Sequence, residues 1–139
     1  MCGIIMLGAP MQEVDIQYYL INYDKIEVVV DGQNVDINEV ELNNALTFML
    51  QASHQIPALG VSVDSEVQKA VNNGIWLKFI YNKPNYVEEM PFDELLIQVE
   101  PSFSGFNIIR GNNGFYEGRC YYVDLLGNTM AGIYNTIIN

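Results

Sequence analysis

Few side chains in this sequence have the type and spacing that catalysis needs. His54 is the only histidine, and no cysteine or carboxylate stands around it at a ligand or triad spacing. A lone histidine supplies one metal ligand or one base, so neither a zinc centre nor a Ser-His-Asp triad is indicated. Cys2 and Cys120 lack metal-ligand spacing, and there is no glycine-rich phosphate loop. The sequence therefore predicts no catalytic residue, metal or cofactor, and favours a protein that acts by binding.

The two arginines of the chain flank an Asn113-Gly114 pair, which is a strong signal for a two-residue hairpin turn. Either a two-residue or a four-residue loop there places Arg110 and Arg119 on one face with Glu117 between them. A two-residue loop would set Arg110 directly opposite Glu117 as a cross-strand ion pair. The alternative is a site for a small anion or nucleotide, because guanidinium groups match phosphate and carboxylate. The candidate residues for that site are Arg110, Asn112, Tyr116 and Arg119.

Acidic residues gather in two segments. One surrounds an expected turn and helix start, and the other lies in an expected loop between two strands, where Met90, Pro91 and Phe92 stand among the acids. A mobile acidic loop that presents an aromatic side chain and a methionine is a plausible protein-docking surface. The other interpretation is a solvated loop with Phe92 folded onto the core. The candidate partner-binding residues are Glu88, Glu89, Phe92, Asp93, Glu94, Asp31, Asp36 and Glu39.

The charge balance narrows the class of partner. The chain has 6 Lys and Arg against 17 Asp and Glu, a formal net charge of −11. Since charged residues make up only 17% of the chain, against ~25% in an ordinary globular protein, the acidity comes from a shortage of bases. Such a field speeds encounter with a basic protein, or simply keeps a small hydrophobic domain soluble. Direct binding of nucleic acid is excluded, because phosphate neutralisation needs bases.

The N-terminal segment carries no recognisable targeting signal. No stretch approaches the roughly 20 apolar residues of a membrane span, and Met1–Pro10 lacks the basic region of a secretory signal. We expect a cytoplasmic protein, because two cysteines do not make a disulfide framework. We expect residues 1–10 to be disordered, an ordered strand, or an over-extended start, with Met6 or Met11 as the natural first residue.

The opening Met1-Cys2-Gly3-Ile4-Ile5 resembles the start of class II glutamine amidotransferases. The resemblance implies that Cys2 becomes an N-terminal nucleophile after Met1 is removed, and that Asn113-Gly114 stands where the family places the Asn-Gly of its oxyanion hole. It covers about five residues. The family's arginine-bearing segment ahead of the Asn-Gly is missing here, and its domain is longer than this chain. An N-terminal cysteine hydrolase is the only concrete form of an enzyme hypothesis.

Helical signals dominate the first half of a chain that we expect to form a single domain, residues 1–139. A short helix is predicted within Met11–Tyr23, and Asp31-Gly32 predicts a hairpin turn. Asn38 and Glu41 form a capping box for a helix that runs to about Ala52. The remaining expected helices are one capped by Asp64 and ended by Gly74, and one capped by Asn128 with Met130, Ile133 and Ile137 inward.

After Gly74 the hydrophobic period changes from 3.6 to 2 residues, which indicates strands with one buried face. The runs of inward residues are Ile75–Tyr81, Leu95–Val99, Phe106–Ile108 and Tyr121–Leu125. We therefore expect an α+β fold with an antiparallel sheet of four to five strands, formed by this C-terminal meander, and helices packed on one face.

These features favour a small acidic protein that inhibits or neutralises a basic, nucleic-acid-handling protein, as immunity proteins and phage anti-defence inhibitors do. Its acidic face would occupy the partner's nucleic-acid groove, with Phe92, Trp76 or Tyr116 as apolar anchors. The alternatives are the arginine-bearing anion or nucleotide site and the N-terminal cysteine hydrolase.

Overall fold

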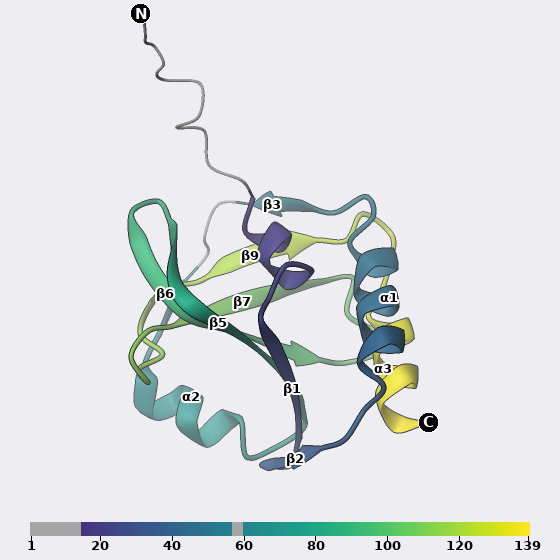
Figure 1. Ribbon diagram of the computed structural model, residues 1–139. Coiled ribbons are helices and arrows are strands. Elements are labelled where there is room, and N and C mark those ends of the chain that lie inside the picture. Colours follow the sequence, from purple (N-terminus) through teal and green to yellow (C-terminus); the bar gives the residue numbers. More distant parts are fainter. Residues whose placement is uncertain (1–14, 57–59) are drawn as a thin grey trace, which may run out of the picture.

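Seven antiparallel strands form one twisted sheet in the computed structural model, which describes residues 15–56 and 60–139 (Figure 1). In order across the sheet, the strands are β2 (Gln33–Val35), β1 (Lys25–Val30), β5 (Ile75–Val87), β6 (Met90–Val99), β7 (Gly105–Gly111), β9 (Tyr121–Asp124) and β3 (His54–Ile56). β4 (Val61–Ser62) and β8 (Gly118–Arg119) make a separate two-stranded pair. Together with the helices, this sheet confirms the α+β class.

The sheet is wider than the predicted four to five strands. The β1–β2 hairpin turns at Asp31-Gly32 as expected, and β1 pairs with β5 from Lys25↔Ile80 to Val30↔Ile75. At the other edge, β3 pairs with β9. β3 has only three residues and follows a helix directly, so it is too short to show the alternation that identified the other strands.

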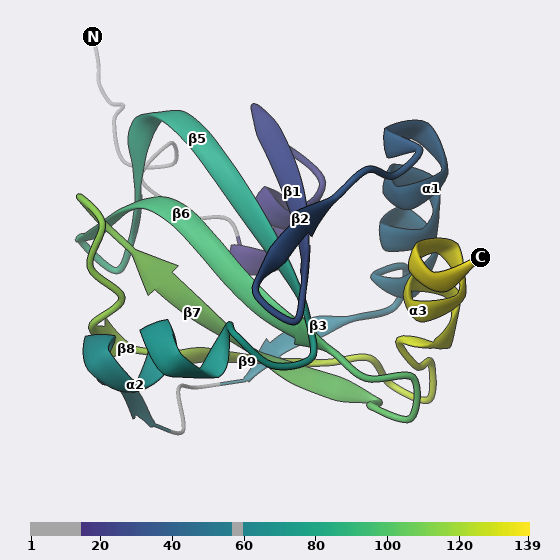
Figure 2. The ribbon, with the colours of Figure 1, turned by 90° about the horizontal axis from the view of Figure 1, so that it is seen from below.

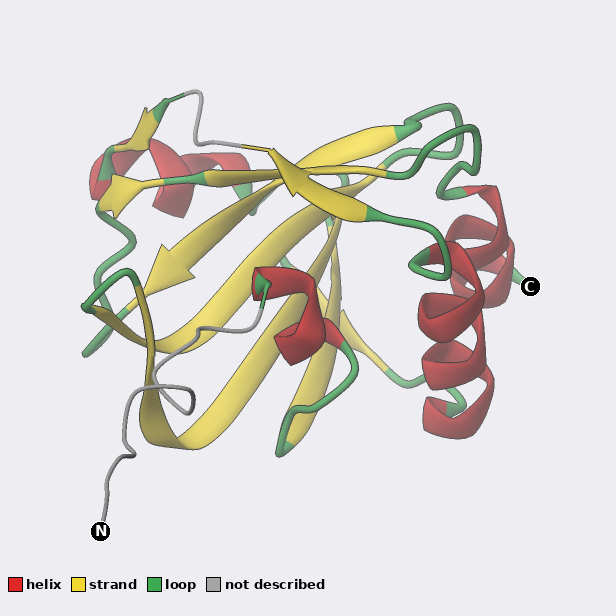
Figure 3. Cartoon of the chain, turned by 90° about the horizontal axis from the view of Figure 1, so that it is seen from above, coloured by secondary structure: helices red, strands yellow, loops and turns green. Residues whose placement is uncertain are grey.

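Three α-helices and one short 3-10 helix pack against this sheet: α1 (Glu39–Met49), α2 (Asp64–Ala70), α3 (Ala131–Ile138) and the 3-10 helix η3 (Ile16–Leu20). α1 and α3 lie side by side, and with η3 they cover the concave face (Figures 1 and 3). α2 packs on the opposite face, so the prediction that all helices share one face is wrong. No helix of the described residues is long and apolar enough to cross a membrane.

The alternation of apolar residues divides the core into two parts. Inward residues of every long strand pack with α1, α3 and η3, and among them Leu77, Phe79, Leu95, Ile97 and Ile108 are fully buried. The residues between them point to the outer face, where a smaller cluster packs under α2. That outer cluster consists of Val29, Val67, Trp76, Leu96 and Tyr116.

The helix ends are only partly as predicted. Asn38 is the N-cap of α1, where its Oδ1 accepts from the Glu41 backbone N–H at 3.0 Å, and α1 ends at Met49. Asp64 does not cap α2. The N-cap is Val63, and Asp64 Oδ1 accepts instead from the Tyr116 backbone N–H at 2.8 Å. Within 11–23, the described part of the expected helix is the single turn η3.

Asn128 does not cap the C-terminal helix as predicted; it connects the loop before that helix to the C-terminal end of α1. The N-cap of α3 is Met130. The Asn128 side-chain amide donates to the carbonyl oxygens of Phe48 at 3.1 Å and Met49 at 3.4 Å, at the C-terminal end of α1. The last carbonyls of a helix have no partner within the helix, so this long-range contact satisfies them.

We expect Asn128→Ala to lower the free energy of unfolding by about 1–2 kcal/mol, because it removes the side-chain donor from the Met49 carbonyl and leaves the Phe48 carbonyl with backbone donors only. Asn135→Ala is the matched control. Asn135 is exposed on α3, and its replacement should change stability by less than about 0.5 kcal/mol. Urea unfolding measures both, and equal losses in the two variants would contradict the bridging role.

Candidate functional site

The predicted acidic loop is a tight hairpin turn. β5 and β6 pair up to Val87↔Met90, so that Glu88 and Glu89 alone form the turn, with φ of 48° and 67°. Phe92 belongs to β6 and has no exposed surface, since its ring packs edge-on against Tyr19 and Tyr81. Of the two interpretations, Phe92 folded onto the core is therefore correct, and Phe92 displayed to a partner is wrong. The acidic residues Glu88 and Glu89 do remain exposed at the turn.

The second turn has the predicted two-residue form, but the strands beyond it shift register. Asn113 and Gly114 have φ of 53° and 85°, and the flanking Asn112 and Phe115 exchange backbone hydrogen bonds. Farther along, Ile108 pairs with Tyr121, which brings Arg110 to Arg119 instead of Glu117. The ion pairs found within the described residues are Lys25–Glu27 and Arg119–Glu88, and the expected Arg110–Glu117 pair is not among them.

The second turn packs against β6, and both turns lie on the same side of the molecule (Figures 1 and 2). The backbone N–H of Asn113 donates to Asp93 Oδ2 at 3.2 Å. The Tyr116 hydroxyl donates to Glu94 Oε2 at 2.5 Å. Arg119 Nη1 lies 3.8 Å from Glu88 Oε1. The structure thus brings together the acidic segment 88–94 and the hairpin that carries the two arginines.

Arg110 is the only buried charged side chain of the described residues, at 7% exposure. Its Nε donates to the Arg119 carbonyl at 3.1 Å, its Nη1 to the Pro91 carbonyl at 3.3 Å, and its Nη2 faces Met90 Sδ at 3.4 Å. A side chain on Gly118 would place its Cβ only 2.7 Å from Nη2. The guanidinium is therefore enclosed, and each of its three nitrogens has a partner in the chain, which leaves it poorly placed to bind an anion.

The other predicted anion-binding residues do not converge on an open site. Tyr116 is 6% exposed, and both its hydroxyl and its backbone N–H have partners in the chain. Arg119 is exposed and lies beside Glu88. Asn112 forms backbone hydrogen bonds across the turn. Of the four residues, only Arg119 offers an exposed positive charge.

The second predicted acidic group lies at the far end of β5. Asp31 Oδ1 accepts from the Gly74 N–H at 2.9 Å, at the point where β5 begins, whereas Glu88 follows its last residue. Asp36 and Glu39 are exposed between the β1–β2 hairpin and α1. A strand of thirteen residues is long enough to keep the two groups well apart. The eight candidate residues therefore form two separate acidic regions and no continuous face.

Exposed aromatic residues do occur at the two turns, though they are not the predicted ones. Trp76 and Tyr116 are 5% and 6% exposed, so neither can serve as an anchor on the surface. Tyr86, two residues before Glu88, is 58% exposed, and Phe115, beside Gly114, is 61% exposed. Sequence analysis missed both. A signal was present for Phe115, since the residue after an Asn-Gly turn starts a strand at the exposed tip.

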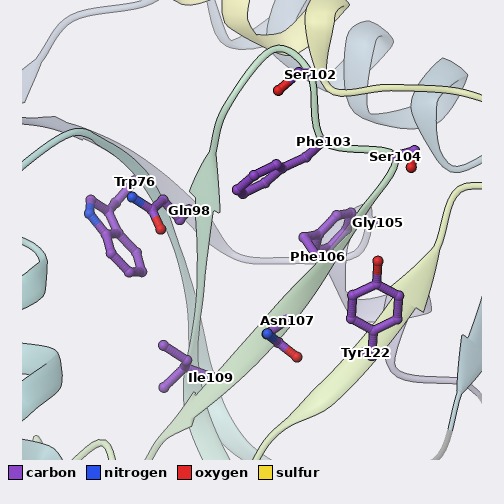
Figure 4. A pocket seen from close by; sticks show the side chains of 10 residues that line it. All are labelled: Trp76, Gln98, Ser102, Phe103, Ser104, Gly105, Phe106, Asn107, Ile109 and Tyr122. Atoms are coloured by element: carbon purple, nitrogen blue, oxygen red, sulfur yellow. The ribbon is translucent and has the colours of Figure 1, made fainter. Parts of the chain in front are cut away.

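A hollow of about 550 Å³ on the outer face of the sheet was not predicted from the sequence (Figure 4). Trp76 and Gln98 lie on one side, Asn107 and Tyr122 on the other, and Phe103 between them. A second hollow of about 410 Å³ shares Asn107, Ile109 and Tyr122 with the first and extends to α2. The available signal was Trp76, a large aromatic residue at an outward position of its strand.

The residues that could serve as metal ligands or nucleophiles lie apart from one another in the described part of the chain. No group of three His, Cys, Asp or Glu side chains converges to hold a metal ion there. His54 is exposed on β3. Cys120 is a free, buried thiol, and burial raises its pKa. Cys2, the proposed N-terminal nucleophile, and residues 1–10 as a whole lie outside the described residues.

Comparison with known proteins finds no matching family model, and no significant match among curated proteins or solved structures.

The two arginines should differ sharply in their effect on stability. Arg110→Met leaves the carbonyls of Pro91 and Arg119 without their donor, and we expect it to lower the free energy of unfolding by about 2–3 kcal/mol. Arg119→Met removes an exposed side chain with one long ion pair, and should cost less than about 0.5 kcal/mol. Chemical denaturation tests this, and equal losses would show that the buried guanidinium is not structural.

The buried tyrosines predict a loss of stability in alkali. Burial raises the pKa of Tyr116, and the hydrogen bond to Glu94 raises it further. Burial likewise raises the pKa of Tyr121, whose hydroxyl donates to Glu88. The folded state therefore holds these protons more tightly than the unfolded chain, whose tyrosines titrate near 10.

Below pH 10 these protons are bound in both states. Above pH 10 the unfolded chain releases them first, so the free energy of unfolding falls by up to about 1.4 kcal/mol per pH unit for each tyrosine. We expect denaturation between pH 9 and 11.5 to give this decline, and Tyr116→Phe and Tyr121→Phe each to make it shallower. A slope unchanged in both variants would refute the assignment.

Proposed function

We propose that this protein inhibits or neutralises a basic, nucleic-acid-handling protein by docking on it through its two hairpin turns. The contact region, here called the two-turn surface, consists of Tyr86, Glu88, Glu89, Phe115 and Glu117. The observation that carries the proposal is that the Arg119–Glu88 ion pair and the hydrogen bond from Asn113 to Asp93 join the two hairpins, each of which exposes one aromatic ring near its turn.

The electrostatics of the two-turn surface favour a basic partner. Glu89 and Glu117 are exposed and belong to neither of the ion pairs of the described residues. The exposed guanidinium of Arg119 lies 3.8 Å from Glu88 and offsets one of the three glutamates, while that of Arg110 is enclosed by backbone carbonyls. Negative charge at an exposed tip steers a basic surface toward it and fixes the orientation of docking.

The aromatic residues and the turn geometry supply affinity. Tyrosine at the centre of an interface is often a hot spot, because it buries a large area with few rotatable bonds. Both turns are short, and hydrogen bonds of Asp93 and Glu94 hold the second against β6. A surface organised in this way before binding loses little conformational entropy when it docks.

Docking on the nucleic-acid groove of a basic protein would compete directly with phosphate for its lysines and arginines. This mechanism requires neither a catalytic residue nor a cofactor. It also fits the cytoplasmic location expected from the cysteine content, and one protein surface docked on another needs fewer acids than a full mimic of nucleic acid.

The test compares two variants of equal charge in capture from the lysate of the source organism. Glu89→Gln with Glu117→Gln removes two charges from the two-turn surface, and Asp36→Asn with Glu39→Gln removes two at the other end of β5. We expect wild type and the second variant to capture the same basic protein at low salt. The first variant should lose most of it, and Tyr86→Ala with Phe115→Ala should weaken binding at least about tenfold.

The captured protein is then purified, and its activity on nucleic acid is measured with and without this chain. Inhibition by wild type and by the Asp36/Glu39 variant, but not by the two-turn variants, supports the proposal. Capture that falls equally in both charge variants would indicate non-specific attraction and overturn it. Capture of a protein with no nucleic-acid activity would overturn the inhibitory role.

A further inference from the structure

Strands β6 and β7 move apart beyond a short paired stretch, and a groove lies on the outer face of the sheet at this point. β6 and β7 pair only through Glu94↔Gly111, Leu95↔Arg110 and Leu96↔Ile109. Beyond this short ladder β7 continues beside β9, while residues 100–104 lead from β6 to β7. The 550 Å³ hollow lies on this stretch, and it adjoins the 410 Å³ hollow, with which it shares lining residues; the two together are here called the groove.

The groove is almost free of charge in a strongly acidic protein. None of the ten residues that line the first hollow is charged, and the second adds only Glu66, from α2. Without a lysine or arginine in the lining, a phosphate or carboxylate ligand would have no counter-charge. One peripheral carboxylate also gives a cation little to bind. The chemistry of the lining therefore selects an uncharged ligand.

The polar side chains of the groove are available to such a ligand. Within the described part of the chain, the side chains of Gln98, Asn107 and Tyr122 form no hydrogen bond. Each amide can donate and accept at once, and the tyrosine hydroxyl can do both. Gln98 and Asn107 lie on opposite sides of the hollow (Figure 4). A ligand between them would meet hydrogen-bonding groups from two directions.

Aromatic rings make up much of the remaining wall. The Trp76 indole is held in place, because its Nε1 donates to the Asn73 carbonyl at 2.9 Å. Phe103 is 36% exposed and lies over the hollow. The Tyr122 ring lies directly on Gly105, where a Cβ would come within 2.0 Å of its hydroxyl oxygen. Phe103 and Tyr122 offer flat apolar surface for the C–H faces of a ligand, whereas Trp76, at 5% exposure, lines the hollow with only a small part of its surface.

We propose that this groove binds a neutral oligosaccharide. A sugar ring combines apolar C–H faces with uncharged hydroxyl groups that both donate and accept, which is the complement of this lining. The volume of the first hollow is within the range of small-molecule sites, about 300–1,000 Å³. The extension toward α2 provides room for a further ring beyond the first. The site is independent of the two-turn surface, because it shares no residue with it.

The position of Trp76 makes the test direct, because it is the only tryptophan in the chain. An array of neutral and acidic glycans identifies a bound saccharide, which is then titrated while tryptophan fluorescence is recorded. We expect saturable binding of a neutral glycan with a change in the emission of Trp76. Gln98→Ala and Asn107→Ala should each weaken binding about five- to tenfold, the effect of one lost hydrogen bond.

Asn34→Ala serves as the control, since it removes an exposed amide from β2, away from the groove. It should bind like wild type, and thermal unfolding verifies that all variants are folded. Glu89→Gln with Glu117→Gln should also bind the glycan normally, so failure of the proposed inhibitory function would not affect this result. Absence of binding to every neutral glycan, preference for acidic glycans or for adenosine, or equal weakening by Asn34→Ala would overturn the proposal.

Discussion

The hydrogen bonds of the Arg110 guanidinium hold together the two hairpins of this molecule. The guanidinium reaches from β7 to the carbonyl of Pro91 in β6 and to the carbonyl of Arg119 in β8, so one side chain fastens the first hairpin to the second. The cost of burying a charge is offset only where its hydrogen bonds are satisfied, and those carbonyls do so. Gly118, with φ of 117°, leaves the space that the guanidinium fills. The two acidic turns owe their fixed relation to this contact.

The short pairing between β6 and β7 that contains Arg110 also marks where the two strands begin to separate. Arg110 stands opposite Leu95 in the middle of the short ladder that joins β6 to β7. On one side of that ladder the chain forms the two turns, and on the other side the strands lose their pairing and the groove begins. Inward residues such as Ile97 and Ile108 still fill the core below the separation. The outer positions therefore can carry amides and aromatic rings without loss of the fold.

Local signals in the sequence were sufficient for much of this structure. Asp31-Gly32 and Asn113-Gly114 predicted tight turns correctly, since both residues of such a turn need positive φ. The turn at Glu88-Glu89 gave no comparable signal, because glutamate rarely adopts that conformation. The sequence therefore predicts a mobile acidic loop here, and it leaves open whether Phe92 is displayed on that loop or folded onto the core. The shift of register that brings Arg110 to Arg119 depends on a buried contact across three strands, which no pattern of alternation encodes.

The distribution of charge separates the two surfaces chemically. A chain with only 6 basic residues against 17 acidic ones keeps Arg110 inside the protein, and Arg119 lies beside Glu88, so Glu89 and Glu117 remain exposed outside the ion pairs found in the described residues. Glu66 is the one charged residue among those that line the groove. A negative field of this kind repels an anion approaching either surface. An uncharged ligand is indifferent to that field, so it could occupy the groove whether or not a basic protein is docked on the turns.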